Sequence, residues 1–290
     1  MNLALHCQNV SHWFGPKRVL YEVEVQVPRG QFLSLVGPSG CGKSTLLRAI
    51  LGTHRPHQGT ILVWQPGNPD GVAVREPGPD RGIVYQQYSL YPFLTALQNV
   101  AVGLMLDQTS FPFRIFQWPK WRRLRKRHLA EAEAMLARVK LADALDLYPH
   151  EMSGGMRQRV ALAQALIMKP EIILLDEPFG ALDEATREDL QKLLLKLHDE
   201  NVATARGGPA APAYTLIIVT HELNEALLVG DRVVGLSQSA PIFKMEHAAE
   251  REEFARQREE IRRVVFEPTI ASRRTEHIVP MLTTSAKPSF

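Results

Sequence analysis

Apolar residues recur at two spacings along the chain, and these spacings separate predicted strands from predicted helices. Alternation of apolar and polar residues predicts two half-buried strands, at Leu3–Val10 and Val19–Val27. Short apolar runs predict further strands at Phe32–Val36, Thr60–Trp64, Gly82–Gln86, Ile172–Leu175 and Tyr214–Thr220. Apolar residues at helical spacing predict helices at Lys43–Gly52, Arg125–Lys140, Arg157–Met168 and Glu184–Glu200.

The order of these elements predicts the fold class. Strands separated by helices favour a parallel sheet covered on both faces, and therefore an α/β core. Residues from about 88 to 165 are mostly helical and interrupt the alternation, which predicts a helical subdomain. We expect surface segments at Gln65–Gly82 and at Asn201–Ala213, which are rich in proline and glycine. Residues 244–263 hold six basic and six acidic side chains, which is typical of a solvated helix.

Composition and charge narrow the classes of protein that this chain can be. Its 290 residues fit one large or two ordinary domains, and 45% hydrophobic with 22% charged residues excludes a disordered or collagen-like chain. The net charge of +3 is unevenly placed: residues 108–128 hold seven Lys or Arg and no acid, leaving 27 − 31 = −4 elsewhere. This balance argues against a nucleic-acid partner. Two cysteines, Cys7 and Cys41, exclude a disulfide framework and indicate a reducing compartment.

Membrane-targeting features are not predicted. The first residues lack the charged and apolar regions of a secretory signal. The uncharged stretch Gly82–Leu106 is long enough to test as a membrane span, but Gln86, Gln87, Pro92 and Asn99 would place polar groups in hydrocarbon. We therefore expect a cytosolic protein that serves a membrane, if at all, from outside the bilayer.

A phosphate-binding loop follows the predicted strand Phe32–Val36 and opens the predicted helix Lys43–Gly52. Its glycines let successive backbone N–H groups surround phosphates, and the helix N-terminus adds a positive dipole end. We expect Lys43 to reach the β- and γ-phosphates and the Ser44 hydroxyl to hold Mg²⁺. The loop consists of Gly37, Pro38, Ser39, Gly40, Cys41, Gly42, Lys43, Ser44 and Thr45.

Two carboxylates follow the predicted strand Ile172–Leu175. Ligands of open α/β sheets bind at the carboxyl ends of the strands, so Asp176 is expected near the Mg²⁺ of the phosphate loop. Glu177 is one residue further on, where it can orient or deprotonate a water that attacks the γ-phosphate.

A third motif, Met152-Ser153-Gly154-Gly155-Met156, precedes the helix that contains Arg157. With it, residues 3–237 resemble the ATP-binding-cassette (ABC) ATPases, whose signature motif usually reads Leu-Ser-Gly-Gly-Gln. The resemblance implies that Ser153, Gly154 and Gly155 contact ATP. It also implies a Mg²⁺- and water-sensing role for Gln86, an interface position for Asp183 and a γ-phosphate contact for His221. Met152 and Met156 depart from the usual motif, but the phosphate contacts come from the Ser153 hydroxyl and the backbone N–H groups of the two glycines, so the chemistry does not depend on these two positions.

Two adjacent aromatic residues are candidates for the platform on which adenine stacks. The resemblance implies that Phe14, just before Gly15, stacks on adenine. Trp13 is adjacent and competes for the same role.

The resemblance also implies an architecture and partners. The fold would be a P-loop NTPase of the ABC type, with an antiparallel β subdomain and the helical subdomain, over residues 1–240; residues 241–290 would form a helical or irregular extension. Two cassettes, identical or closely related, would bind ATP between them.

The chain would power import through separate membrane permease subunits with a substrate-binding protein, at the cytoplasmic face of the inner membrane. The motifs look most like the nitrate, sulfonate and taurine group. The alternatives are an exporter ATPase and a soluble non-transport ABC ATPase.

The basic segment at residues 108–128 also holds five aromatic residues. One interpretation is a solvated basic loop. The other is contact with the anionic membrane face beside the permease, where each basic residue contributes ~1 kcal/mol.

Overall fold

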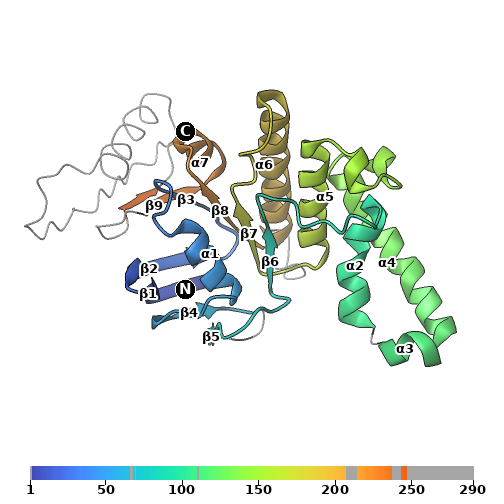
Figure 1. Cartoon of the computed structure of the whole chain (residues 1–290), viewed down its shortest axis with the longest axis horizontal. Helices are drawn as coiled ribbons and strands as arrows, with labels where there is room; N and C mark the ends of the chain where they lie inside the picture. Colours follow the sequence, from blue (N-terminus) through green and yellow to red (C-terminus); the bar gives the residue numbers. More distant parts are fainter. Residues whose placement is uncertain are drawn as a thin grey trace, which may run out of the picture.

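The computed structural model describes residues 2–65, 68, 70–109, 111–206, 214–236 and 243–246. Figure 1 shows a central sheet with the antiparallel strands β1, β2 and β4 on one side and a helical subdomain on the other. The strands are β1 (Leu3–Phe14), β2 (Lys17–Pro28), β3 (Phe32–Val36), β4 (Gln58–Val63), β5 (Val72–Ala73), β6 (Arg81–Val84), β7 (Ile172–Asp176), β8 (Thr215–Thr220), β9 (Arg232–Gly235) and β10 (Phe243–Glu246). The helices are α1 (Lys43–Leu51), α2 (Ala96–Gln108), α3 (Phe111–Phe116), α4 (Trp118–Arg138), α5 (Gly154–Ile167), α6 (Glu184–Arg206) and α7 (Leu223–Val229), with 3₁₀ turns η1 (Ala142–Ala144) and η2 (Pro149–Glu151).

The described strands form two sheets. The larger has the order β10-β9-β3-β8-β7-β6, and its pairs are parallel except for the antiparallel pair β9–β10. The smaller is antiparallel, with the order β2-β1-β4-β5. The expected α/β core with an antiparallel β subdomain is therefore present.

Successive residues of the parallel strands point to opposite faces, and each face has its own core. Ile173 and Leu175 of β7 pack on the side of α5 and α6. Ile172 and Leu174 pack on the other side, against α1 and the antiparallel sheet. Cys7 of β1 is buried in this second core, and burial raises the pKa of its thiol to about 12. The parallel sheet is thus held on both faces, which fixes the loops at the carboxyl ends of its strands.

The helical subdomain is built from α2, α4 and α5, which share the core under α6. The loop into α2 is shaped by the fully buried Asn99, whose Nδ2 atom donates to the backbone oxygens of Tyr91, Leu94 and Thr95 at 2.9–3.1 Å. Thr95 and Gln98 form a capping box at the start of the helix. No helix among the described residues is long and apolar enough to cross a membrane.

Several predicted boundaries were wrong. Helix α4 begins at Trp118, not at Arg125, so the basic segment is helical and not a loop. Helix α6 continues to Arg206, and within it Asn201 makes two hydrogen bonds with the backbone of Tyr214; residues 201–206 therefore belong to this helix and not to the proline- and glycine-rich segment expected at Asn201–Ala213. Strand β10 occupies residues 243–246, where a helix was expected, because it pairs with β9. The rest of that expected helix, and residues 207–213, lie outside the described residues.

Candidate active site

The loop at residues 37–45 connects β3 to α1, as the sequence predicts. Gly42 has a φ of 102°, and a Cβ atom there would lie 2.9 Å from the carbonyl oxygen of Val19, so this position requires glycine. The buried Lys43 donates from Nζ to the carbonyl oxygens of Gly37 at 2.7 Å and Pro38 at 3.1 Å. The ammonium group is therefore held against the loop itself.

The Ser44 hydroxyl and the Asp176 carboxylate lie together at the end of β7. Ser44 Oγ donates to Asp176 Oδ1 at 3.0 Å. Burial raises the pKa of Asp176, and the neighbouring Glu177 adds to this rise, whereas the hydrogen bond from Ser44 opposes it. Hydroxyl and carboxylate oxygens are ligands that Mg²⁺ accepts beside phosphate oxygens, so this donor pair fits a magnesium ion bound with a nucleotide.

Glu177 follows Asp176 in an unusual backbone conformation. Its φ of 47° is in the left-handed region, which costs a non-glycine residue free energy and is common at functional sites. Its N–H group donates to the carbonyl oxygen of Val219 at 2.9 Å, and its Oε2 atom lies 3.3 Å from Nδ1 of His221. The ends of β7 and β8 thus bring these two predicted site residues together.

Gln86 borders the same position from the end of β6. A Cβ atom added at Gly180 would lie 3.4 Å from Gln86 Nε2 and 3.9 Å from Glu177 Oε2, so both side chains flank this glycine. The amide and the carboxylate therefore face one small space beside the phosphate loop.

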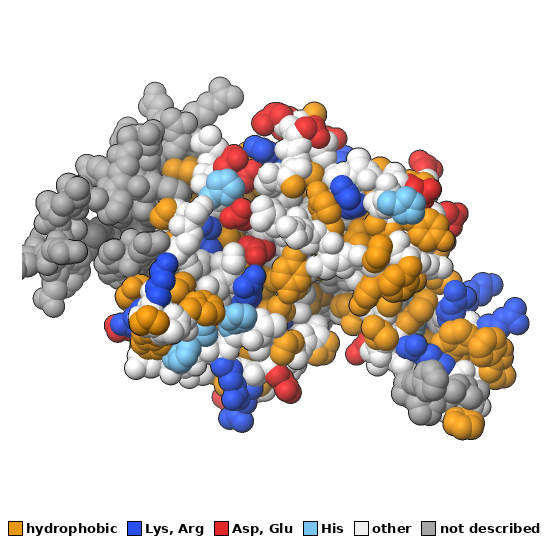
Figure 2. All heavy atoms as spheres, in the orientation of Figure 1, with side chains coloured by type: hydrophobic (Ala, Val, Ile, Leu, Met, Phe, Trp, Pro, Cys, Tyr) orange, Lys and Arg blue, Asp and Glu red, His pale blue; other side chains and the backbone are white. Residues whose placement is uncertain are grey.

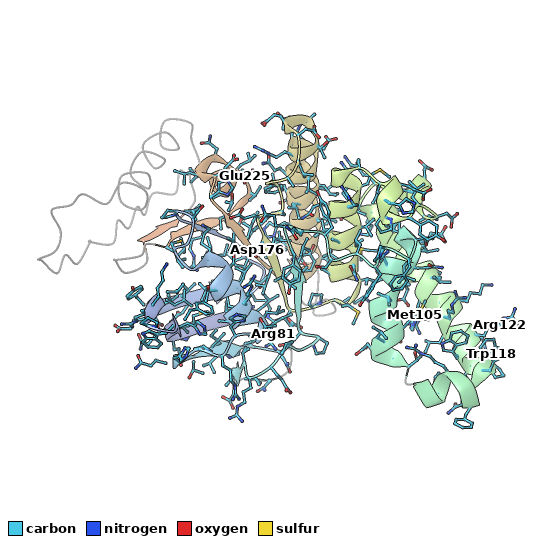
Figure 3. All side chains as sticks on the ribbon, in the orientation of Figure 1. Arg81, Met105, Trp118, Arg122, Asp176 and Glu225 are labelled. Carbon is cyan, nitrogen blue, oxygen red and sulfur yellow. The ribbon has the colours of Figure 1, made fainter. Side chains whose placement is uncertain are left out.

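A buried carboxylate that sequence reasoning missed supports the segment around His221. Glu225 of α7 accepts a hydrogen bond from Thr220 Oγ1 at 2.6 Å, and Arg187 Nε lies 3.7 Å from its other oxygen. Glu225 is labelled above Asp176 in Figure 3. Burial raises the pKa of Glu225. The signal available in the sequence was a carboxylate one helical turn after the end of a buried strand.

The two adjacent aromatic residues at the end of β1, Trp13 and Phe14, have different surroundings. Trp13 lies under the Arg18 guanidinium, 5.1 Å from the ring centroid, and edge-on to His57. Phe14 is 48% exposed, with His12 against its edge at 4.8 Å. The more accessible ring is that of Phe14.

The signature segment caps α5. Ser153 is the N-cap residue, and its Oγ atom accepts from the Met156 N–H group at 3.2 Å. A Cβ atom at Gly155 would lie 2.2 Å from Thr186 Cγ2, so glycine allows α5 to approach α6 closely. Met152 is buried in the core and Met156 packs against it, so the two departures from the usual motif are accommodated by apolar packing.

Asp183 caps α6 rather than contacting the phosphate loop. Its Oδ1 atom accepts from the Thr186 N–H group at 3.1 Å, and this hydrogen bonding lowers the pKa of the exposed carboxylate. The signature segment likewise contacts Leu182, Thr186 and Tyr88. In Figure 1, β7 and α6 lie between α1 and α5, so the phosphate loop and the signature segment are separated within one chain.

Comparisons with known proteins agree with this geometry. The family profile described as "ABC transporter" matches residues 20–180, more than half of the chain. The nitrate import ATP-binding protein NrtD of Synechococcus elongatus is 37% identical over 262 residues, which cover 90% of this chain and 84% of that protein. The bicarbonate transport ATP-binding protein CmpD of Synechocystis sp. is 39% identical over 79% of this chain and 73% of that protein. For NrtC of Synechococcus elongatus the identity is 42% over 77% of this chain, which spans 29% of that longer protein.

Solved structures give the same fold. The dimeric ATP-binding cassette MJ0796, in a post-hydrolysis state bound to ADP and Pi, has a TM-score of 0.65 and 28% identity, covering 85% of this chain and 100% of that chain. The ADP-bound cassette MJ1267 has a TM-score of 0.70 at 23% identity, covering 92% of this chain and 96% of that chain, which shows the fold alone. Family, relatives and structures together show that this chain belongs to the ABC transporter family and is an ATP-binding subunit that hydrolyses ATP.

Proposed function

We propose that this chain is the ATP-hydrolysing subunit of an importer for a small anion, of the nitrate type. The observation that carries hydrolysis is the convergence of Ser44, Asp176, Glu177 and His221 at the carboxyl ends of β7 and β8. The importer assignment is supported by relatives named for the import of nitrate, bicarbonate and sulfate or thiosulfate.

Each residue of the site has a proposed role. Lys43 transfers from the loop carbonyls to the β- and γ-phosphates when ATP binds. Ser44 and Asp176, with Gln86, would hold Mg²⁺, which would neutralise phosphate charge. Glu177 orients and deprotonates the attacking water, and His221 holds the Glu177 carboxylate and contacts the γ-phosphate. Phe14 stacks on adenine.

A second cassette completes the site in this proposal. The loop at 37–45 and the segment Ser153–Gly155 are separated within one chain, so ATP bound at the loop of one copy would meet the signature segment of another. Asp183 would lie between the copies. The dimer of MJ0796, which is similar to this chain, supports this arrangement.

A pocket beside the site supports docking of permease subunits. It has a volume of about 350 Å³ and lies between β6, α2 and α5, where Arg81, Tyr91, Gly103, Ala161 and Met168 are among its lining residues. The ring of Tyr91, which lines the pocket, lies 5.8 Å from the ring of Phe93, which is 71% exposed, so aromatic surface continues outward from the pocket. We propose that a cytoplasmic permease helix occupies this pocket, which puts the chain at the cytoplasmic face of the membrane, together with a substrate-binding protein on the other side.

Transport by the assembled complex tests this proposal. The chain is purified with the permease that accompanies it from its native membrane and is reconstituted in vesicles. ATP turnover should rise when the binding protein is supplied with one of nitrate, bicarbonate, sulfate or taurine, and labelled anion should move from the binding-protein side into the compartment that holds ATP. Movement toward the binding-protein side, or turnover unaffected by any of these anions, would overturn the importer assignment.

A further inference from the structure

We propose that the end of the helical subdomain, residues 116–127, is a surface that binds anionic phospholipid headgroups. We call these residues the basic tip. They comprise the end of α3 and the first turns of α4. Figure 2 shows basic and hydrophobic side chains gathered at this end of the molecule.

The basic tip is held in place by polar contacts at its base. Arg114 of α3 donates from Nε to Thr109 Oγ1 at 2.9 Å and from Nη2 to the Met105 carbonyl oxygen at 2.9 Å. His128 of α4 is buried, and its Nε2 atom lies 3.0 Å from Gln108 Oε1 of α2. These contacts tie α3 and α4 to α2, so the tip is a structured projection.

The tip exposes large aromatic side chains. Phe116 is 84% exposed and Trp118 is 56% exposed. The rings of Trp118 and Trp121 lie 4.7 Å apart, with the Arg125 guanidinium 5.9 Å from the Trp121 ring. Exposed tryptophan is favourable at the level of lipid headgroups, where its ring has both an apolar and a polar environment.

The charge of the tip is of one sign. No acidic residue occurs between Asp107 and Glu131. Among the ion pairs of the described residues, one involves the tip, between Arg127 and Glu131. The exposed basic side chains of the tip are Lys120, Arg122, Arg123, Arg125, Lys126 and Arg127. An anionic membrane surface would attract this cluster and relieve its self-repulsion.

Basic and aromatic side chains are arranged together along α4. Trp118, Trp121, Arg122 and Arg125 have the spacing i, i+3, i+4 and i+7, which places them on one stripe of the helix. Figure 3 shows Trp118 and Arg122 side by side at the outer end of the tip. Tryptophan rings and long basic side chains both lie favourably at the level of lipid headgroups, so a stripe that combines them suits contact with a membrane surface.

The position of the tip favours lipid over nucleic acid, an inference that rests on the proposed permease contact. Gly103 of α2 lines the pocket assigned to the permease, and α2 ends at Gln108, about 8 Å further along the helix. Figure 3 places Arg81, Met105 and Trp118 in its lower part, with Asp176 above them. A chain docked at that pocket would therefore present the tip toward the membrane around the permease.

Flotation of the full chain with vesicles tests the proposal. The wild-type chain should float with vesicles of phosphatidylcholine and phosphatidylglycerol, and not with phosphatidylcholine alone. Each basic residue near an anionic surface contributes about a fivefold change in binding, so replacing Arg122, Arg123 and Arg125 with Gln should weaken binding about a hundredfold. High salt should have the same effect as the triple replacement.

A matched variant controls for net charge. Replacing Arg138, Lys192 and Lys196 with Gln removes the same charge from exposed positions away from the tip and should leave flotation unchanged. Trp118→Phe and Trp121→Phe together should abolish quenching of protein fluorescence by brominated lipid, since these rings would enter the headgroup region. The tip variant and the charge-matched control should both keep the wild-type unfolding temperature and ATP turnover.

Three results would overturn the proposal. The wild-type chain fails to float with anionic vesicles, the tip variant floats as well as the wild type, or the tip binds a single-stranded RNA oligonucleotide in preference to vesicles. Flotation needs neither permease nor transported anion. A failed transport assay with intact flotation would therefore overturn the importer assignment alone.

Discussion

The Nδ1 atom of His221 lies 3.3 Å from the Oε2 atom of Glu177, at the ends of the adjacent strands β8 and β7. The adjacent carboxylate, Asp176, is turned to Ser44 instead. Glu177 has a left-handed backbone conformation, and the two successive carboxylates have different partners: Asp176 has the hydroxyl of the phosphate loop and Glu177 has the histidine. Because their partners differ, Asp176 and Glu177 can have different roles although they are adjacent in the sequence.

Replacing Glu177 with Gln should separate ATP binding from hydrolysis. The amide keeps the size of the side chain but cannot accept a proton from water, so turnover should fall by about 10²–10⁴-fold while binding persists. Because ATP would remain between two cassettes, the variant should elute as a dimer in size-exclusion chromatography with ATP and Mg²⁺. Turnover at the wild-type rate would show that Glu177 is not the general base.

Lys43→Ala is the contrasting variant. It removes the ammonium group that the loop carbonyls hold, so ATP binding itself should weaken and no ATP-dependent dimer should form. A Lys43→Ala chain that binds ATP as tightly as Glu177→Gln would contradict the assigned role of Lys43.

Phe14→Ala should weaken ATP binding more than Trp13→Ala. A stacked base contributes about 1–3 kcal/mol, and the Phe14 ring is exposed whereas Trp13 is covered by Arg18 and His57. Titration with a fluorescent ATP analogue measures both affinities. The opposite ranking would move the adenine platform to Trp13.

The stability of the β1 end should depend on pH through His12. Burial, and then the nearby His57, lowers the pKa of His12 below its ordinary value of 6.5. The unfolded chain then binds more protons between these two pKa values, so the free energy of unfolding should fall as the pH drops below 6.5. His12→Gln keeps a donor for the Arg55 carbonyl oxygen and should flatten this dependence in urea unfolding measured across that range. Equal pH profiles for the two chains would contradict the assignment.

Thr220→Val should destabilise the chain by about 1–3 kcal/mol. The substitution removes the hydroxyl that donates to the buried carboxylate of Glu225 and leaves that carboxylate short of a partner. Turnover should also fall, because His221 follows directly. Thr220→Ser, which keeps the hydroxyl, should be close to wild type in urea unfolding and in turnover, and a Ser variant as unstable as Val would point to packing instead.

Local sequence signals predicted the parts of the site that local structure determines. The phosphate loop, Asp176 and Glu177 lie where strand ends and a glycine-rich turn place them. The adenine platform could not be decided from two adjacent aromatics, because the covering of Trp13 depends on Arg18 and His57 from other segments.

The errors have physical causes in pairing and packing. Strand β5 has two residues and exists because β4 offers an edge, which no local pattern indicates. The start of α4 extends beyond the core, so its first turns lack the apolar periodicity that marks a helix; Pro119 in the first turn was the available signal. The predicted end of helix α6 was too early, and the contact of Asn201 with Tyr214 joins residues 13 positions apart, which no local pattern indicates.

Both cysteines of the chain are buried, Cys7 in β1 and Cys41 in the phosphate loop, and burial raises the pKa of each thiol. Thiolates are the reactive form, so at neutral pH both side chains should react slowly with maleimides and methanethiosulfonates. A single cysteine introduced at an exposed position such as Phe116 would then accept a spin label or a fluorophore while the natural sequence is otherwise kept. Distances between labelled copies, and the depth of a label in a bilayer, therefore become measurable without first removing a residue from the nucleotide loop.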